Sequence, residues 1–505
     1  MSNRDLPPEL ETARREIEKI ARSYGLDFFD TIFEILEDRE INEVASFGGF
    51  PVRYPSWRFG MDYDRLSKEY RYGLAKIYEM VINNDPSYAY LMRSNGAVDQ
   101  KMVMAHVFGH VDFFKNNMWF GPTDRRMVDT MANHGTRVRR AMDDHGIVAV
   151  EEFLDMALSI DNLIDPYSPY SPKSNASQRG REFLNDTKER PEPPGAGRIQ
   201  TSAGHGYMDR YLNPKAAMDK EKVRLQKEAA QARRDPPSPQ RDVLAFLIAR
   251  APLERWERDL LEMVREEAIY YVPQAMTKIM NEGWATFWHS RIMTRHVLRD
   301  SDIIDFADHH SGTVGAAPGQ VNPYKLGVEL WRDIEARWNR GAFGSEYEHC
   351  DDAEKRRKWD TGAMLGNKKI FEVRKIFNDV TFIEEFFTDE FAREHKYFVY
   401  KRNARTGRME IADRNPRLVK EALLRRITNG GAPVICVEDA NYKNRGELFL
   451  AHAHEGADLQ FDHAQETLTM LGRLWKRPVH LKSLDEGKEK IFTYDPGSVE
   501  KRKRS

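Results

Sequence analysis

The spacing of apolar residues predicts helices over most of the first 395 residues. Between 9 and 160, apolar side chains recur every three or four positions, which is the period of one helix face, and the pattern is clear between 64 and 84. Residues 46–60 interrupt the succession, because they contain three glycines and two prolines. The aromatic side chains of this stretch favour a loop packed over a neighbouring surface.

Helical periodicity returns after residue 241. The clearest helices are expected at Asp242–Ala251, Leu253–Tyr270, Pro273–Arg299 and Tyr324–Asn339. Pro273 is expected to start its helix, since proline is well tolerated in the first turn.

The pattern changes again near residue 396, where short apolar runs replace the helical period. Two helices, near 415–428 and 463–475, separate some of these runs. The predicted fold class is therefore α+β, with a mainly helical N-terminal and central domain and a small α+β C-terminal domain. The predicted strands are 397–400, 409–411, 433–437, 447–451 and 478–481.

Residues 166–241 differ in composition from both flanking regions. They hold ten of the 24 prolines and few large aliphatic side chains, so they bury too little apolar surface to order fully. We expect a partly disordered excursion, with a charged helix near 214–234, between two halves of one helical domain. The predicted organisation is 1–165 and 242–395 for the helical domain, 166–241 for the excursion, 396–497 for the α+β domain and 498–505 for a basic tail.

Composition narrows the class of protein. A formal net charge of −2 over 505 residues gives no general attraction to nucleic acid, and no nucleic-acid partner is expected. With only Cys350 and Cys436, neither a disulfide framework nor a cysteine zinc cluster can form. No run approaches the roughly 20 apolar residues of a membrane span, and the N-terminus has no secretory pattern. We therefore expect a cytoplasmic protein without a membrane span.

The first motif with chemical content is His106-Val-Phe-Gly-His110. Imidazoles at i and i+4 project from one helix face and can hold one metal ion. The stripe that carries them also carries Met102 and Phe113, so both rings are expected to be buried. The alternative is a pair of core histidines hydrogen-bonded to carboxylates or backbone carbonyls, and spacing alone does not separate the two.

The second motif is Asn281-Glu-Gly-Trp-Ala285, followed by His289. It resembles the Asn-Glu-Gly-Phe-Ala sequence on which gluzincin peptidases carry their third zinc ligand. The resemblance implies that Glu282 is a ligand in a gluzincin-like core, and that Gly283 and Ala285 let the helix approach its neighbour. His289, two turns along the same face, is either a further ligand or a partner that orients one.

The predicted cofactor is thus a divalent metal held by His106, His110 and Glu282, with His289 as a fourth candidate. Zinc is the first expectation, and iron or manganese also suits two histidines with carboxylates. A conventional general base is missing, because Val107 stands where the peptidase motif H-E-x-x-H has glutamate.

Replacement bases are expected on the preceding helix. Glu267 and Glu266 are the candidates, against the alternative of an ordinary salt-bridged helix face. Asp112 is expected on another side of its own helix. His309 and His310 are expected in a loop, either contacting substrate or simply exposed. Phosphate-binding loops and the Gly-x-Ser-x-Gly nucleophile motif are absent.

Taken together, these motifs resemble the SpoVR family, named for stage V sporulation protein R. The resemblance implies a link to the spore cortex in spore-forming bacteria and to stress physiology in others. It also implies two partners: a PrkA-type serine kinase and a protein with a von Willebrand A-like domain. Valine after the first histidine is a trait of the family. The matching segments are Ala45–Met61, His106–Asn117, Ile164–Pro166, Met280–His289, Asn322–Gly327 and Glu394–Lys396.

Two hypotheses follow. In the first, the chain is a cytoplasmic metalloprotein that hydrolyses an amide, such as one in a cell-wall precursor or peptide. In the second, it is a non-catalytic partner in the kinase-linked module, and its histidines are structural.

Overall fold

The chain folds into two compact units, each made of two separated segments. Unit 1 comprises residues 1–144 and 270–431, and unit 2 comprises residues 145–269 and 432–505. Residues 396–431 therefore belong with the helical unit. A mainly helical body with small sheets confirms the predicted α+β class. The computed structural model describes residues 4–71, 79–171, 218–220, 223–224, 234–315, 317 and 319–496.

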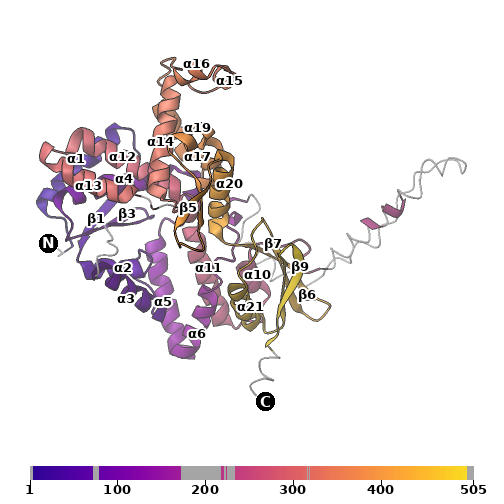
Figure 1. The fold of residues 1–505 in the computed structure, drawn as a ribbon. Coiled ribbons are helices and arrows are strands. Elements are labelled where there is room, and N and C mark those ends of the chain that lie inside the picture. The colour runs from indigo at the N-terminus through magenta and orange to yellow at the C-terminus, as the bar shows by residue number, and fades with distance from the viewer. Residues whose placement is uncertain are drawn as a thin grey trace, which may run out of the picture. The chain divides into compact units, whose positions relative to one another are not determined.

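Unit 1 is organised around a central helix, α4 (Ala97–Asn116), which is buried on nearly every side between Gln100 and Phe114. Two further long helices, α12 (Lys278–Ile292) and α14 (Pro323–Arg340), complete the central layer: α12 packs on α4, and α14 packs on α12 (Figure 1). Large aromatic side chains fill the core between them, including the fully buried Trp284, Trp288 and Trp331.

The remaining helices of unit 1 surround this layer. Helix α1 packs on α4, and α17 packs on both α4 and α14. Figure 1 shows α14 extending away from the body to the short helices α15 and α16. These elements are α1 (Pro8–Ser23), α2 (Asp38–Ser46), α3 (Trp57–Arg71), α5 (Met127–His145), α13 (Ile303–Val314), α15 (Ser345–Glu348), α16 (Ala353–Arg357), α17 (Gly366–Ile376), α18 (Asp379–Phe386), α19 (Asp389–Glu394) and α20 (Pro416–Ile427).

A three-stranded sheet in unit 1 corrects the expected succession of helices between 9 and 160. Its order is β1-β3-β2, with β1 (Thr31–Leu36) parallel to β3 (Ser87–Met92) and β2 (Glu79–Ile82) antiparallel to β3. Strand β3 is buried along nearly its whole length, so it shows no alternation that would separate it from a buried helix.

The expected helix between 64 and 84 is also wrong. Helix α3 begins earlier, at Trp57, and is described as far as Arg71, whereas residues 79–82 form β2. The apolar run Met80-Val-Ile82 fits either a strand or a helix face, and pairing with β3 decides the outcome. Residues 46–56 are largely non-helical, and Phe50 packs on Tyr270 and Tyr271.

The helix expected to start at Pro273 starts later. Pro273 lies inside α11 (Arg255–Met276). The helix is interrupted at Thr277, whose φ is −128°. The first turn of α12 is capped by a residue distant in sequence: the Asp379 carboxylate accepts hydrogen bonds from the backbone N–H groups of Ile279 and Met280, at 2.8 and 2.9 Å. This cap sets where the helix with Glu282 begins.

Small residues bring the three central helices into backbone contact. A Cβ atom on Gly109 would lie 2.7 Å from the Cα of Ala285, and one on Gly283 would lie 2.4 Å from the Cα of Gly327. A Cβ on Gly327 would lie 2.2 Å from the carbonyl oxygen of Ile279. The expectation that Gly283 and Ala285 permit close approach is confirmed.

Unit 1 ends with a two-stranded antiparallel ribbon, β4 (Val399–Arg402) and β5 (Met409–Asp413), followed by α20. Both strands lie close to the predicted positions. The ribbon covers the loop before α14, because Met409 and Tyr400 pack against Gly319.

Unit 2 contains a four-stranded sheet of order β6-β7-β8-β9, in which only the β7–β8 pair is parallel. Three of its strands match predictions. Strand β9 was not expected, because its sequence Lys-Glu-Lys-Ile-Phe-Thr-Tyr begins with charged residues and is largely exposed. The elements are α6 (Ile147–Leu158), α10 (Val243–Arg250), β6 (Val434–Tyr442), β7 (Glu447–Ala453), α21 (Phe461–Trp475), β8 (Val479–Asp485) and β9 (Lys488–Tyr494), with the first part of α11.

Most of the predicted excursion at 166–241 and the whole tail at 498–505 lie outside the described residues. Of the charged helix expected near 214–234, residues 218–220 and 223–224 are described, and they are helical. Among the described residues, no helix has the length and apolarity that crossing a bilayer requires.

The backbone contact at Gly327 predicts a strong response to one methyl group. Gly327→Ala should lower the free energy of unfolding by about 2 kcal/mol, because overpacking outweighs the gain in helix propensity. Urea unfolding followed by circular dichroism measures this change. The control is Gly312→Ala in α13, where a Cβ meets nothing within 4 Å and stability should stay equal or rise. Equal changes in the free energy of unfolding for the two substitutions would contradict a backbone contact between α12 and α14 at Gly327.

Candidate metal centre

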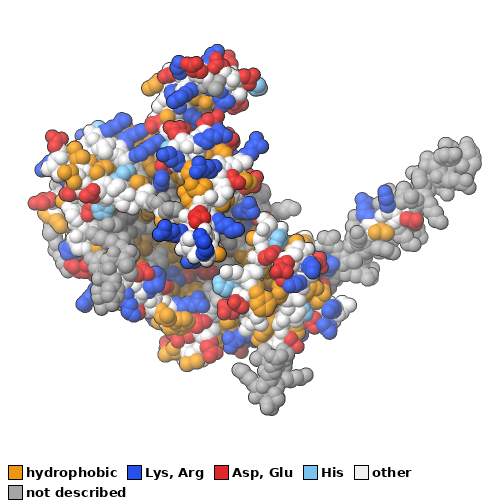
Figure 2. Space-filling model, viewed as in Figure 1, with side chains coloured by type: hydrophobic (Ala, Val, Ile, Leu, Met, Phe, Trp, Pro, Cys, Tyr) orange, Lys and Arg blue, Asp and Glu red, His pale blue; other side chains and the backbone are white. Residues whose placement is uncertain are grey.

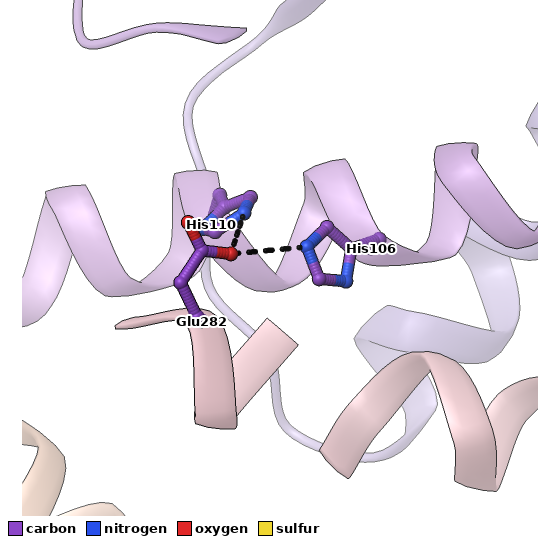
Figure 3. A group of neighbouring side chains, drawn as sticks. All are labelled: His106, His110 and Glu282. Atoms are coloured by element: carbon purple, nitrogen blue, oxygen red, sulfur yellow. Dashed lines mark ion pairs between the residues drawn. The ribbon is translucent and has the colours of Figure 1, made fainter. Parts of the chain in front are cut away.

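Three predicted ligands meet where α4 and α12 cross. His106 and His110 project from α4, one turn apart, and Glu282 points toward both from α12 (Figure 3). The Oε2 atom of Glu282 lies 3.5 Å from Nε2 of His106 and 3.4 Å from Nε2 of His110. One ligand atom from each residue lies within 4.8 Å of the others, and both rings are buried. We call these three residues the His–Glu group.

The His110 ring is oriented by the residue before Glu282. Its Nδ1 lies 2.9 Å from Oδ1 of Asn281. An amide oxygen only accepts hydrogen bonds, so Nδ1 of His110 must carry the proton and donate. In the neutral ring this leaves the lone pair on Nε2, directed at Glu282. Partners of this kind set the tautomer of metal-binding histidines.

The His106 ring is held by a chain of two further histidines. Its Nδ1 lies 2.8 Å from Nδ1 of His289, and Nε2 of His289 lies 3.2 Å from Nδ1 of His310. If His106 Nδ1 donates, its Nε2 lone pair faces Glu282, and His289 Nε2 then donates to His310. His289 thus contacts His106 on the side away from Glu282, which favours the role of orienting partner over that of ligand.

The electrostatics of the site favour an ionised Glu282 carboxylate and lower the pKa values of His289 and His310. Burial raises the pKa of Glu282, but His110 and His106 lower it by more than burial raises it. The pKa of Glu282 is therefore well below its usual range. Burial, reinforced by His106 and His310, holds the pKa of His289 well below its usual value. Burial and the charge of Arg332 lower the pKa of His310. The rings of His289 and His310 are therefore neutral near pH 7, and each can accept a hydrogen bond.

The sequence motifs assigned no role to Asn281, Ser290 and Arg332, and they gave His310 only the alternatives of substrate contact or simple exposure. His310 and His309 were expected in a loop, but they lie in helix α13. His309 forms an ion pair with Asp99 of α4 at 2.5 Å, which ties the two helices together. Arg332 of α14 donates to Ser290 Oγ at 3.3 Å. No periodicity predicts these contacts, since the partners lie on different helices.

Comparison with known proteins places the chain. Residues 5–432 match the family described as SpoVR like protein, and residues 433–486 match the SpoVR-like C-terminal domain. The uncharacterized protein YcgB of Escherichia coli (strain K12) is 30% identical over 425 residues, which are 80% of this chain and 76% of that protein. The chain belongs to the SpoVR family. The membership in the SpoVR family that the sequence motifs predicted is confirmed. No solved structure matches the chain.

The SpoVR match covers all of the His–Glu group and ends where unit 1 ends. The two family regions meet at 432/433, and the second segment of unit 2 begins at residue 432. The boundary found by comparison therefore agrees with the boundary found from contacts to within one residue.

Val107 and Asp112, which lie close to the two histidines in the sequence, are both buried and contribute to the packing of unit 1. Val107 is fully buried in the hydrophobic cluster. Asp112 faces another side of α4, as expected, where both carboxylate oxygens lie 2.6 Å from Nη1 of Arg374. Asp112 also accepts from Trp284 Nε1 at 2.8 Å. It joins α4, α12 and α17, and this role leaves it unsuited to act as a base.

The predicted bases lie in the other unit of the SpoVR chain. Glu266 and Glu267 are on the part of α11 that belongs to unit 2, whereas the His–Glu group belongs to unit 1. Glu267 is 4% exposed and Glu266 is exposed. Their catalytic role stays a prediction.

The Asp379 cap of α12 makes the stability of unit 1 depend on pH. Burial raises the pKa of Asp379 to about 7, although the N–H groups of Ile279 and Met280 lower it. The folded state therefore holds this proton more tightly than the unfolded chain, whose aspartates titrate near pH 4. The stabilising contribution is complete below that pH and is lost as the pH rises through 7.

Metal-free protein should thus lose about 2 kcal/mol from this one group between pH 5.5 and 8, by the linkage of pKa to stability. The Asp379→Asn variant, which keeps one oxygen acceptor and cannot ionise, should lack this part of the pH dependence. Urea unfolding of both proteins at the two pH values measures it. Identical pH slopes would show that Asp379 is ionised throughout the range.

Proposed function

We propose that this SpoVR protein binds one divalent metal ion through His106, His110 and Glu282 and uses it to hydrolyse an amide bond. Zinc is the first choice, with iron or manganese as alternatives. The observation that carries the proposal is the position of Glu282 Oε2, almost equidistant from the two Nε2 atoms. We place the reaction in the cytoplasm, in cell-wall or stress physiology, with a cell-wall precursor or peptide as the substrate class.

The spacing of the ligand atoms supports a tetrahedral site. Zinc ligands lie about 2.0–2.2 Å from the ion, so neighbouring ligand atoms in a tetrahedron are about 3.4 Å apart. The two separations from Glu282, 3.5 and 3.4 Å, agree with this value. In addition, Oε2 of Glu282 is buried, and its contacts with the two Nε2 atoms are long for hydrogen bonds, at 3.5 and 3.4 Å. A buried carboxylate oxygen without a close donor is stabilised by a cation at this position.

Each residue around the proposed ion has a distinct task. Asn281 and His289 hold the rings of His110 and His106 with their Nε2 atoms toward Glu282. Three protein ligands are the number used by catalytic zinc sites, whereas structural sites use four. When bound, the ion would polarise an amide carbonyl and lower the pKa of a coordinated water molecule.

Hydrolysis requires a base that accepts a proton from the attacking water molecule, and residue 107 cannot be that base. A valine side chain cannot take a proton, and this one lies in the core. Glu267 and Glu266 remain the proposed bases. Within unit 1, His310 is the alternative, because it ends the chain of rings that begins at His106 and has a neutral ring near pH 7.

A second candidate function is a non-catalytic role beside a PrkA-type serine kinase and a protein with a von Willebrand A-like domain. The buried Val107 favours it, since a site without its adjacent base suits a structural ion. In this case the metal would stabilise the crossing of α4 and α12 without reacting. Co-purification with the kinase that survives loss of the histidines would favour this candidate.

Metal analysis tests the site directly. Purified protein should contain about one equivalent of metal, and the His106→Ala/His110→Ala double variant should contain less than about a tenth of that, because catalytic sites need all three ligands. The control is His349→Ala, which removes an exposed histidine outside the site. Equally low metal in wild type and double variant, after supply of zinc, iron and manganese in turn, would sink the proposal.

A peptide-release assay tests the reaction separately. Metal-loaded protein incubated with a mixture of cell-wall peptides should release new amino groups, which fluorescamine detects, and Glu282→Gln should abolish the release. The substitution preserves size but weakens the ligand. If metal binds stoichiometrically and no amine appears, the hydrolytic half of the proposal fails and the structural role is favoured.

A further inference from the structure

One surface segment of unit 1 carries a marked excess of positive charge. Between 396 and 426 there are ten lysines and arginines but only three acidic residues, in a chain whose net charge is −2. The segment comprises β4, β5 and α20, and we call it the basic ribbon–helix surface. Its cations are Lys396, Lys401, Arg402, Arg405, Arg408, Arg414, Arg417, Lys420, Arg425 and Arg426.

The cations of this surface lack close carboxylate partners among the described residues, unlike the arginines of helix α1. On α1, Arg14, Arg15 and Arg22 pair with glutamates of the same helix at 2.7 to 3.1 Å. Within the described residues, by contrast, no carboxylate lies within 4.0 Å of any of the ten. The recorded contacts are neutral: Arg402 and Lys420 donate to backbone oxygens, and Arg414 lies over Phe398. In the part of the chain that the structure describes, no ion pair offsets their charge.

The basic ribbon–helix surface is exposed and held in place. All of its cations except the half-buried Lys420 are exposed, and Figure 2 shows lysine and arginine side chains gathered where Figure 1 places β5 and α20. Helix α20 packs on α18 and α19 and buries Val419 and Leu423. Because the backbone of α20 is already packed, binding a polyanion there has to order side chains only, which favours binding.

The side chains interspersed with the cations indicate which polyanion fits. Met409, Ile411 and Leu418 are 40%, 41% and 40% exposed. Met409 lies opposite Arg402 in the ribbon, so an aliphatic side chain and a cation share one face. The aromatic residues Phe398 and Tyr400 are part-buried. Surfaces that bind single-stranded nucleic acid present exposed aromatic rings for base stacking, whereas bilayer interfaces accept cations beside aliphatic side chains.

We propose that the basic ribbon–helix surface docks the protein onto an anionic phospholipid bilayer. The arginines and lysines pair with headgroup phosphates, while Met409, Ile411 and Leu418 enter the boundary between headgroups and acyl chains. Attachment is peripheral, in keeping with the lack of a spanning helix among the described residues. The proposal is independent of the His–Glu group and its metal.

Vesicle co-sedimentation of the full chain tests the docking. Protein should pellet with vesicles of phosphatidylcholine and phosphatidylglycerol and not with phosphatidylcholine alone, and high salt should release it. Arg405→Glu/Arg408→Glu should weaken binding about tenfold or more, since each basic residue near an anionic surface contributes to affinity. The control Lys355→Glu/Arg357→Glu makes the same charge change on exposed residues of α16 and should bind as wild type.

A second variant separates a bilayer from nucleic acid. Met409→Ser/Ile411→Ser keeps every cation, so it should weaken vesicle binding while leaving any affinity for single-stranded RNA unchanged. Circular dichroism confirms folding of each variant. Equal pelleting with neutral and anionic vesicles, equal loss in the α16 control, or binding of RNA without binding of vesicles would each overturn the proposal.

Discussion

The backbone contact of α12 with α4 on one side and α14 on the other is the constraint on which unit 1 depends. Glycines at 109, 283 and 327 allow it, because a methyl group at any of them would meet another helix within 2.7 Å. The distance from Glu282 to the two histidines follows from this crossing, since Glu282 is the neighbour of Gly283. A wider separation of the helices would leave the Glu282 carboxylate buried and out of reach of the two histidine rings. The chemistry of the site is thus set by residues that have no functional groups.

Two buried carboxylates then remove the freedom that the crossing leaves. Asp379 determines where α12 starts, and Asp112 links α4 to Trp284 of α12 and to Arg374 of α17. One controls position along the helix axis and the other controls rotation about it. In the same way, Asn281 fixes the orientation of the His110 ring and His289 fixes that of the His106 ring. Several independent contacts therefore fix the positions of the three proposed ligands, whereas Val107, at the place of the usual base, packs in the hydrophobic core. This arrangement suits the binding of an ion better than it suits proton transfer by residue 107.

The proposed ligands His106, His110 and Glu282 could be selected from the sequence because their signals are local. His106 and His110 are four residues apart on one helix, and Glu282 lies in a five-residue motif. The supporting contacts have no local signal: His106 and His289 are separated by 183 positions, and Asp112 and Arg374 by 262. The same limit explains the missed sheet, since β1 pairs with β3 across more than 50 residues and β3 is too buried to alternate. Pro273 was misplaced because the start of α12 depends on Asp379, about a hundred residues away.

The division of each unit into two chain segments has a consequence for biosynthesis. The second segment of unit 1 ends at residue 431, so this unit cannot close until that residue has left the ribosome. At about 5–20 residues per second, the first 144 residues wait on the order of tens of seconds for their partners. During that time α4 lacks its later neighbours α12 and α17, so the apolar sides that they cover stay exposed on the nascent chain. Chaperone protection during translation, and delivery of any metal only after release, are the demands that this topology places on the cell.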